Sequence, residues 1–126
     1  MLLSTDLWVG ALIRRASLGG AFAVVVMKGD ARAGSVLVKA LNRRSGEVRL
    51  YAEATRGDGE RVWMQPRPGE AEAALDQYAE RARRIDPDLW LVEIEDAEGR
   101  HFLTEAVEAD DKDDRAGGDK GWPTFR

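Results

Sequence analysis

The segment GDARAG, residues 29–34, has the two glycines of a phosphate-binding loop. A Walker loop has the pattern G-x-x-x-x-G-K-[ST], in which the lysine contacts phosphate and a helix begins at the loop. Here the second glycine is followed by Ser-Val and a strand-like run, so neither the lysine nor the helix is in place. We therefore expect the segment to turn the chain, with positive φ at Gly29 and Gly34 and with Asp30 bonding the turn backbone. Asp30 and Arg32 are kept as candidates for the rim of a binding surface.

Carboxylates between residues 86 and 98 are dense enough to suggest a magnesium or calcium site. Their spacing does not match the D-x-D-x-D-G pattern of a calcium loop, and Glu93 falls on the polar face of an alternating strand. A solvated acidic face is therefore favoured over a metal site. The alternative is a metal-dependent hydrolase or nuclease built on Asp30, Asp86, Asp88 and Glu93, which requires these carboxylates to converge within ~5 Å.

Other catalytic mechanisms are limited by the residue types. The chain has no cysteine and a single histidine, His101, and no serine lies in a nucleophile-elbow pattern. Thiol catalysis and a multi-histidine metal centre are excluded. We predict no catalytic residue, no bound metal and no cofactor, and we favour a binding protein over an enzyme.

Arginines form a second set of candidate binding residues. Arg14 and Arg15 end one predicted helix, and Asp86 and Asp88 flank the proline that ends another. If both helices lie on the same face of the sheet, we expect these charges to form a partly buried clamp. Paired arginines could instead hold a phosphate or a carboxylate.

The charge distribution bears on nucleic-acid binding. The net charge is −4, with an excess of positive charge over residues 1–56 and of negative charge over residues 57–126. A basic face would be built from Arg14, Arg15, Arg43, Arg44 and Arg49. These residues are scattered rather than clustered, which disfavours nucleic acid as a partner. The sequence leaves open whether the partner is a protein or a small molecule, and what the oligomeric state is.

Residues 14–34 imitate a twin-arginine export signal, with Arg14-Arg15, an apolar core and Ala-Arg-Ala before Gly34. The residues before the arginine pair are apolar, whereas an export signal begins with a polar region. Cleavage would also discard two segments that fit a folded domain. We therefore predict a cytoplasmic protein. Its apolar runs are far shorter than the ~20 residues that a membrane-spanning helix needs.

Hydrophobic periodicity predicts an α+β fold, an antiparallel β-meander with two packed helices in the order α-β-β-β-β-α-β-β. Helices are expected at residues 5–18 and 70–85, although the broad apolar face of residues 7–15 is also compatible with a strand. The strands are expected at residues 21–28, 34–42, 47–55, 61–65, 88–96 and 101–105. The first is typical of a strand covered on both faces, whereas the third alternates and presents Tyr51 and Glu53 outward.

Domain organisation follows from length and composition. One α+β domain is expected at residues 1–107, followed by a disordered acidic and glycine-rich tail at residues 108–126. The tail ends in Trp122, Pro123 and Phe125, which are unusual in a solvated segment. They could form a short docking motif or fold back onto the sheet.

Three stretches in combination, LWVGALIRR (7–15), KGDARAGSVLVK (28–39) and DPDLWLVEIED followed by GR (86–100), resemble an uncharacterised family of short alphaproteobacterial proteins, a domain-of-unknown-function family. The resemblance covers most of the expected domain. It implies a cytoplasmic, stand-alone domain and brings no activity or mechanism. The positions that match the family's motifs are Trp8, Arg14, Arg15, Gly29, Asp30, Gly34, Asp86, Asp88, Trp90 and Glu93.

Taken together, these patterns predict a small, soluble binding or interaction module of unknown function. Its candidate binding surface comprises Arg14, Arg15, Asp30, Arg32, Asp86, Asp88 and Glu93.

Overall fold

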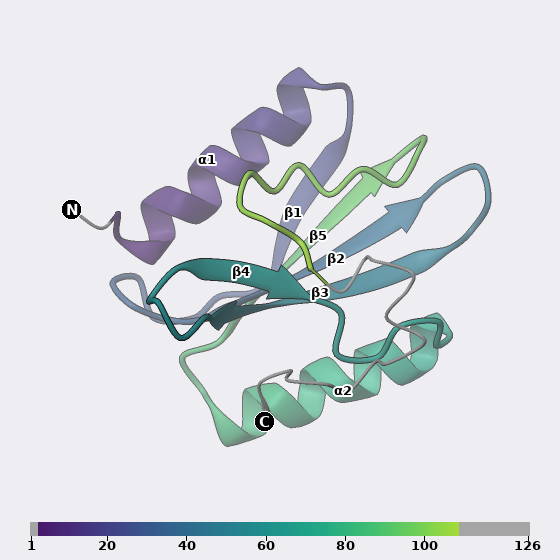
Figure 1. Ribbon diagram of the computed structural model, residues 1–126. Coiled ribbons are helices and arrows are strands. Elements are labelled where there is room, and N and C mark those ends of the chain that lie inside the picture. The colour runs from purple at the N-terminus through teal and green to yellow at the C-terminus, as the bar shows by residue number, and fades with distance from the viewer. Residues whose placement is uncertain (1–2, 109–126) are drawn as a thin grey trace.

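The computed structural model describes residues 3–108 and places two helices on opposite faces of a five-stranded sheet (Figure 1). The helices are α1 (Thr5–Leu18) and α2 (Glu72–Ile85). The strands are β1 (Phe22–Met27), β2 (Val36–Asn42), β3 (Val48–Thr55), β4 (Arg61–Met64) and β5 (Trp90–Asp96). The α+β class is confirmed, and residues 7–15 are helical. The predicted tail, with its terminal aromatic residues, lies outside the described residues apart from Glu108.

The sheet is mixed, with the strand order β1-β5-β2-β3-β4. Strands β2, β3 and β4 form the predicted antiparallel meander. Strand β5 differs from the expectation, because it inserts between β1 and β2 and runs parallel to β2. Trp90, Leu91 and Val92 are buried in succession. A strand with apolar side chains on both faces is stable only in the middle of a covered sheet.

Strand β1 is an edge strand, which corrects the expectation that it is covered on both faces. Its exposed side chains are Phe22, Val24 and Val26, and the residues between them are half-buried. It pairs antiparallel with β5, and the register shifts between Val25 and Met27 at a bulge.

One hydrophobic core lies between α1 and the sheet. Val9, Leu12 and Ala16 of the helix are fully buried against β2 and β5. Trp8 stacks on Trp63 of β4, with ring centroids 5.5 Å apart. A cluster of this kind provides most of the stability of an amphipathic helix in a protein.

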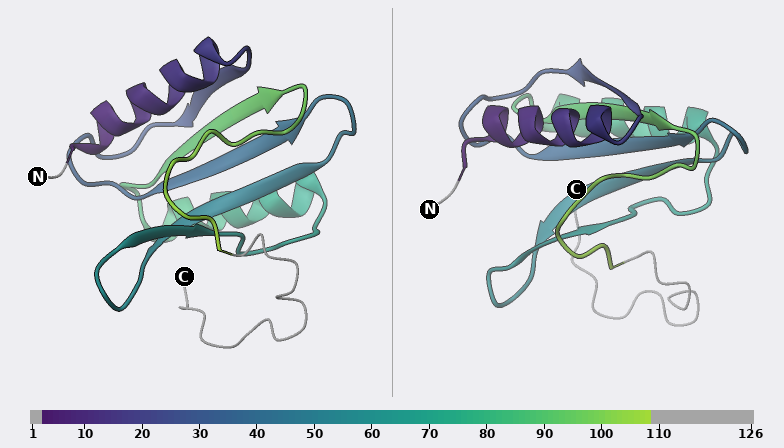
Figure 2. Two further views of the ribbon diagram at one scale, coloured as in Figure 1. Left: turned by 45° about the horizontal axis from the view of Figure 1, so that its top comes forward. Right: turned by 90° about the horizontal axis from the view of Figure 1, so that it is seen from above.

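Residues 100–108 cross the α1 face of the sheet and end beside β4 (Figure 2). The strand predicted at residues 101–105 is not formed. Phe102 has φ of 60°, which interrupts an extended chain. The backbone pairing with β4 is a single bridge, in which Trp63 N–H donates to the Ala106 carbonyl and its own carbonyl accepts from Glu108 N–H (2.9 and 2.8 Å). The Trp63 indole also donates to the Glu105 carboxylate (3.0 Å).

A second core lies on the opposite face, beneath α2. Leu75 and Ala79 of the helix pack on Leu37 and Leu91 of the sheet. Beside this core, the buried ammonium of Lys39 lies 2.6 Å from the Glu72 carboxylate and 2.8 Å from that of Asp76. Burial lowers the pKa of Lys39, but its hydrogen bonds to the two carboxylates outweigh that effect and raise the pKa above its ordinary value.

In the part of the chain that the structure describes, neither helix is long and apolar enough to span a bilayer.

Candidate functional site

The loop 29–34 crosses the start of β5, because β5 lies between the two strands that the loop joins. The Asp30 N–H donates to the Asp88 carbonyl (3.0 Å), and the indole Nε1 of Trp90 donates to the Asp30 carbonyl (2.8 Å). The Asp30 carboxylate accepts from the N–H groups of Arg32 and Ala33 (3.1 and 2.8 Å). Asp30 therefore bonds the turn backbone, as expected.

The two glycines of this loop are required by close approach rather than by positive φ. Neither Gly29 nor Gly34 is among the glycines with positive φ, which corrects the expectation. A Cβ built on either one would lie 2.1 Å from the Asp88 carbonyl oxygen. No side chain larger than hydrogen fits at that distance.

The same loop receives the N-terminus of α1. The N–H groups of Thr5 and Asp6 donate to the carbonyls of Arg32 and Ala31 (3.1 and 2.9 Å). The Thr5 hydroxyl donates to the Gly34 carbonyl (2.9 Å). These contacts satisfy first-turn donors that have no partner within a helix. The loop is thus a junction between α1, β2 and the start of β5.

Asp86 and Asp88 form the other half of this corner. Asp86 ends α2, and its carboxylate accepts from the Asp88 N–H (3.1 Å) while its carbonyl accepts from the Leu89 N–H (3.1 Å). The turn aims the chain into β5. Of the predicted binding surface, the structure brings Asp30, Arg32, Asp86 and Asp88 to this corner.

The remaining predicted residues lie elsewhere. Arg14 and Arg15 are near the far end of α1, and Arg15 donates twice to the Phe102 carbonyl (3.1 and 2.9 Å). Because α1 and α2 cover opposite faces of the sheet, the condition for an arginine–aspartate clamp is not met. Glu93 is half-buried in β5, directly beside Lys39 of β2.

The geometry also bears on the two alternative functions. Among residues 3–108, no group of three or more His, Asp or Glu side chains is arranged to hold a metal ion. The basic residues proposed for nucleic acid lie on α1, on the β2–β3 turn and on β3. Arg49 pairs with Glu47 (2.9 Å), and Arg43 donates to the Glu95 carbonyl (3.4 Å).

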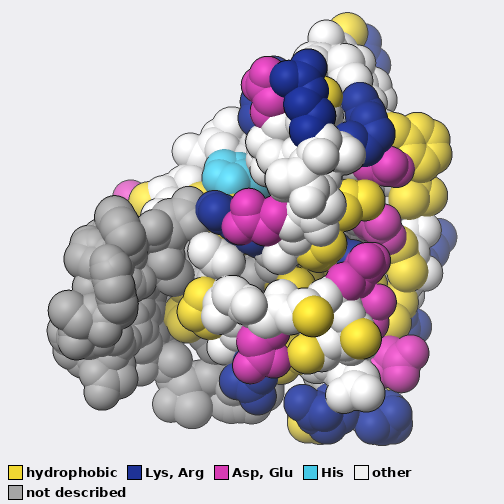
Figure 3. All heavy atoms as spheres, turned by 90° about the vertical axis from the view of Figure 1, so that its right-hand side faces the viewer, with side chains coloured by type: hydrophobic (Ala, Val, Ile, Leu, Met, Phe, Trp, Pro, Cys, Tyr) yellow, Lys and Arg dark blue, Asp and Glu magenta, His cyan; other side chains and the backbone are white. Residues whose placement is uncertain are grey.

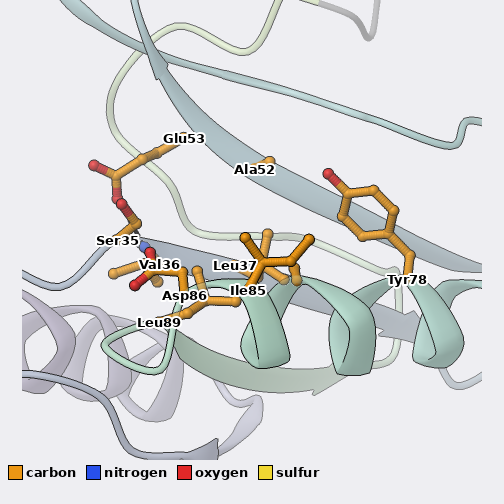
Figure 4. A pocket seen from close by; sticks show the side chains of 10 residues that line it. Ser35, Val36, Leu37, Ala52, Glu53, Tyr78, Ile85, Asp86 and Leu89 are labelled. Atoms are coloured by element: carbon orange, nitrogen blue, oxygen red, sulfur yellow. Dashed lines mark hydrogen bonds between the residues drawn. The ribbon is translucent and has the colours of Figure 1, made fainter. Parts of the chain in front are cut away.

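A cleft of about 210 Å³ lies between the C-terminal half of α2 and the adjoining parts of β2 and β3. Leu37, Ala52 and Ile85 form its apolar middle, and Tyr78 lies at one end (Figure 4). Polar side chains gather at the other end: Ser35, Glu53 and Asp86 (Figure 4). The cleft is therefore apolar along its length and acidic at one end.

Glu53, one of the two acidic residues of this cleft, is half-buried. One carboxylate oxygen accepts from the Val36 N–H (3.0 Å), and the other lies 3.7 Å from the Arg61 guanidinium. Burial raises the pKa of Glu53 above its ordinary value, and Arg61 and the Val36 N–H offset only part of this. Burial therefore favours the protonated form of Glu53 more than these two contacts favour the ionised form.

Sequence patterns singled out only Asp86 among the acidic residues of the cleft. Glu53 was expected on an outward face of β3, but Tyr51 on that face is 2% exposed and Glu53 is half-buried. The covering segment, residues 100–108, is far from β3 in the sequence. In the sequence, the aromatic Tyr51 among the predicted outward positions of β3 was the one sign that this face of the strand is covered.

The fold and its cleft define a small α+β domain with one helix on each side of a mixed sheet. A family model described as "Protein of unknown function (DUF1491)" matches residues 3–104, and the chain belongs to this family. The resemblance drawn from the three sequence motifs is confirmed, and the function of the family is unknown.

Three solved structures are similar to this chain. The crystal structure of a DUF1491 family protein from Caulobacter crescentus is 73% identical, with a TM-score of 0.83, and covers 85% of this chain and 100% of that one. An NMR structure of a DUF1491 family protein from the same organism is 72% identical, with a TM-score of 0.82 and coverage of 86% and 99%. The solution structure of the protein Atu0922 from Agrobacterium tumefaciens is 34% identical, with a TM-score of 0.72 and coverage of 86% and 98%. A search of curated proteins finds no match.

Proposed function

We propose that the chain is a non-catalytic binding module whose cleft between α2, β2 and β3 holds a compact aliphatic group with a positive charge. The observation that carries this proposal is the acidic end of an otherwise apolar cleft, formed by Glu53 and Asp86. The apolar middle would take the carbon chain, and the carboxylates would take the cation.

The size of the cleft limits the ligand. A volume of about 210 Å³ is below the ~300–1,000 Å³ of sites that hold drug-sized molecules. A group of a few carbons is the appropriate size, such as an alkylamine or the side chain of a basic residue.

The electrostatics of Glu53 favour a cation over an anion. Burial penalises the ionised form of a carboxyl group, and a positive charge placed beside it offsets that penalty. Since the ionised form is the one that pairs with a cation, we expect affinity to increase as pH rises through the raised pKa of Glu53.

A matched set of four-carbon probes tests this site by NMR titration. We expect butylammonium to shift backbone amides of residues 35–37 and 52–53, butanol to shift them less, and butyrate to leave them unchanged. Glu53→Gln should weaken butylammonium binding about tenfold, through loss of a charge-assisted contact. As a control, Glu47→Gln changes an exposed acid directly before β3 and should bind butylammonium as tightly as wild type does. Equal binding by Glu53→Gln, or no shift with any probe, would show that the cleft is not the site.

We also infer that the mature protein keeps residues 1–33 and works in the cytoplasm. This is supported by the place of these residues in the fold, because α1 supplies buried Val9 and Leu12 and β1 pairs with β5. Export with cleavage before Gly34 would remove the helix, an edge strand and most of the junction loop. The intact mass of the protein from its native host tests this, and a species beginning at Gly34 would overturn it.

A further inference from the structure

Strand β1 presents an open sheet edge. It pairs with β5 on one side, and no strand of residues 3–108 lies on its other side. The opposite edge of the sheet differs, because residues 106–108 bond to β4 through Trp63. The described part of the domain therefore has one edge that is free to pair.

This edge is unusually apolar. Phe22 is 63% exposed, Val24 41% and Val26 49%. Strand β1 contains no charged residue and no proline, which are two of the features that prevent edge strands from pairing with other chains. A third such feature, a bulge, is confined to the end of the strand. A bulge follows Val25, so residues 22–25 keep regular strand geometry against β5.

We propose that β1 is the interface between two copies of this chain, which join through antiparallel β1–β1 pairing into a continuous ten-stranded sheet. The occupant is a second copy because the exposed positions are self-complementary. A two-fold axis at Val24 sets Val24 against Val24 and Ala23 against Val25 within the regular part of the strand, and it brings Phe22 of each copy beside the bulged Val26 of the other, so each exposed apolar side chain lies near another.

The charges near the strand are compatible with this pairing. Continued in the same register, Lys28 falls opposite Gly20, so no like charges face each other across the axis. Within each copy, Glu93 and Glu95 of β5 lie directly opposite Val24 and Phe22 of β1. These two carboxylates therefore border the row of exposed apolar side chains formed by Phe22, Val24 and Val26. Figure 3 shows hydrophobic side chains next to acidic ones along its right-hand margin.

The interface is short, because β1 has only six residues, of which 22–25 are regular. Interfaces at the small end of the usual range form dimers that dissociate on dilution. We therefore expect a monomer–dimer equilibrium in which the dimer fraction increases with protein concentration.

Sedimentation equilibrium of the full chain and of two matched variants tests the proposal. Val24→Lys places two ammonium groups against each other at the axis and should be monomeric at every concentration at which wild type is dimeric. It should still fold, because Glu93 of β5 lies directly opposite position 24 in the same copy and can pair with the new ammonium group. Leu7→Lys changes an exposed leucine on α1 and should dimerise as wild type does.

Cross-linking gives a second measurement that reports the register. The chain has no cysteine, so Val24→Cys introduces a single thiol. Residues directly opposite each other in an antiparallel pair have Cα atoms ~4.5–5.5 Å apart, which suits a disulfide. Under mild oxidation, Val24→Cys should form a covalent dimer much faster than Leu7→Cys. A wild-type chain that stays monomeric at high concentration, a dimer that survives Val24→Lys, or equal cross-linking rates would each overturn the proposal.

Discussion

Gly34→Ala is expected to destabilise the domain by more than about 3 kcal/mol, and much of the variant protein is expected to be unfolded. The added Cβ would lie 2.1 Å from the Asp88 carbonyl oxygen and 3.0 Å from a ring carbon of Trp90. Backbone atoms cannot rotate out of the way as side chains do. Relief of the overlap would therefore separate the loop from the start of β5 and break the Asp30–Asp88 hydrogen bond.

Chemical denaturation monitored by circular dichroism measures this effect. Gly29→Ala should behave in the same way, since its Cβ meets the same carbonyl oxygen. Two glycines serve as controls because a Cβ on either meets nothing within 4 Å: Gly57 in the β3–β4 turn and Gly10 within α1. Gly10→Ala should stabilise the protein by roughly 0.5–1 kcal/mol, because alanine favours a helix. A Gly34→Ala variant as stable as wild type would contradict the close packing of this corner.

Asp96→Ala is expected to cost about 3 kcal/mol of unfolding free energy and to lower the melting temperature by roughly 10–20 °C. Asp96 is 1% exposed, and its carboxylate accepts from the Glu98 N–H and from the N–H and guanidinium of Arg100 (2.8–3.0 Å). The same guanidinium donates to the Gly19 carbonyl at the end of α1 (3.0 Å). Removal of the carboxylate frees the turn after β5 from the first helix.

The contribution of Asp96 to stability should decrease as pH falls. Hydrogen bonds from Arg100 hold the pKa of Asp96 well below its ordinary value of 3.8, despite burial. A lowered pKa contributes stability that is present above the unfolded-state value and lost as pH falls towards the folded-state value. The stability difference between wild type and Asp96→Asn should therefore be largest at neutral pH and shrink below about pH 4. Asp58→Ala, at an exposed turn position, should cost much less. A difference that stays constant down to pH 2 would contradict the lowered pKa.

Local patterns were sufficient to predict most of the elements. The stripe of Ala71, Leu75, Tyr78, Ala82 and Ile85 predicts α2. Its three middle members pack on the sheet as that pattern requires, whereas the two at the ends of the helix are exposed. The dipeptide Asp58-Gly59 predicts the β3–β4 hairpin, and Gly59 has the positive φ that such a turn needs. These predictions hold because the forces that form a helix or a hairpin act between residues close in sequence.

Strand order and the candidate site depend instead on contacts between distant residues. The position of β5 between β1 and β2 is set by the burial of Trp90 and Val92 between strands that lie more than fifty residues earlier in the chain. That placement explains why Gly29 and Gly34 approach Asp88, which the loop pattern alone cannot show. The packing of α1 and α2 on opposite faces, which separates the arginine pair from Asp86, likewise depends on contacts between distant residues.

During synthesis from the N-terminus, α1 and β1 leave the ribosome long before their partner strand exists. The β2–β3–β4 meander consists of contacts between neighbouring segments and can form as soon as residue 64 has emerged. Strand β1 pairs with β5 alone, so it cannot join the sheet until residue 96 is available. Long-range pairings of this kind slow folding and leave apolar surface open while they are incomplete. Strand β1 is therefore made before the other strands but joins the sheet only after β5, and until then the nascent chain carries an unpaired, valine-rich strand.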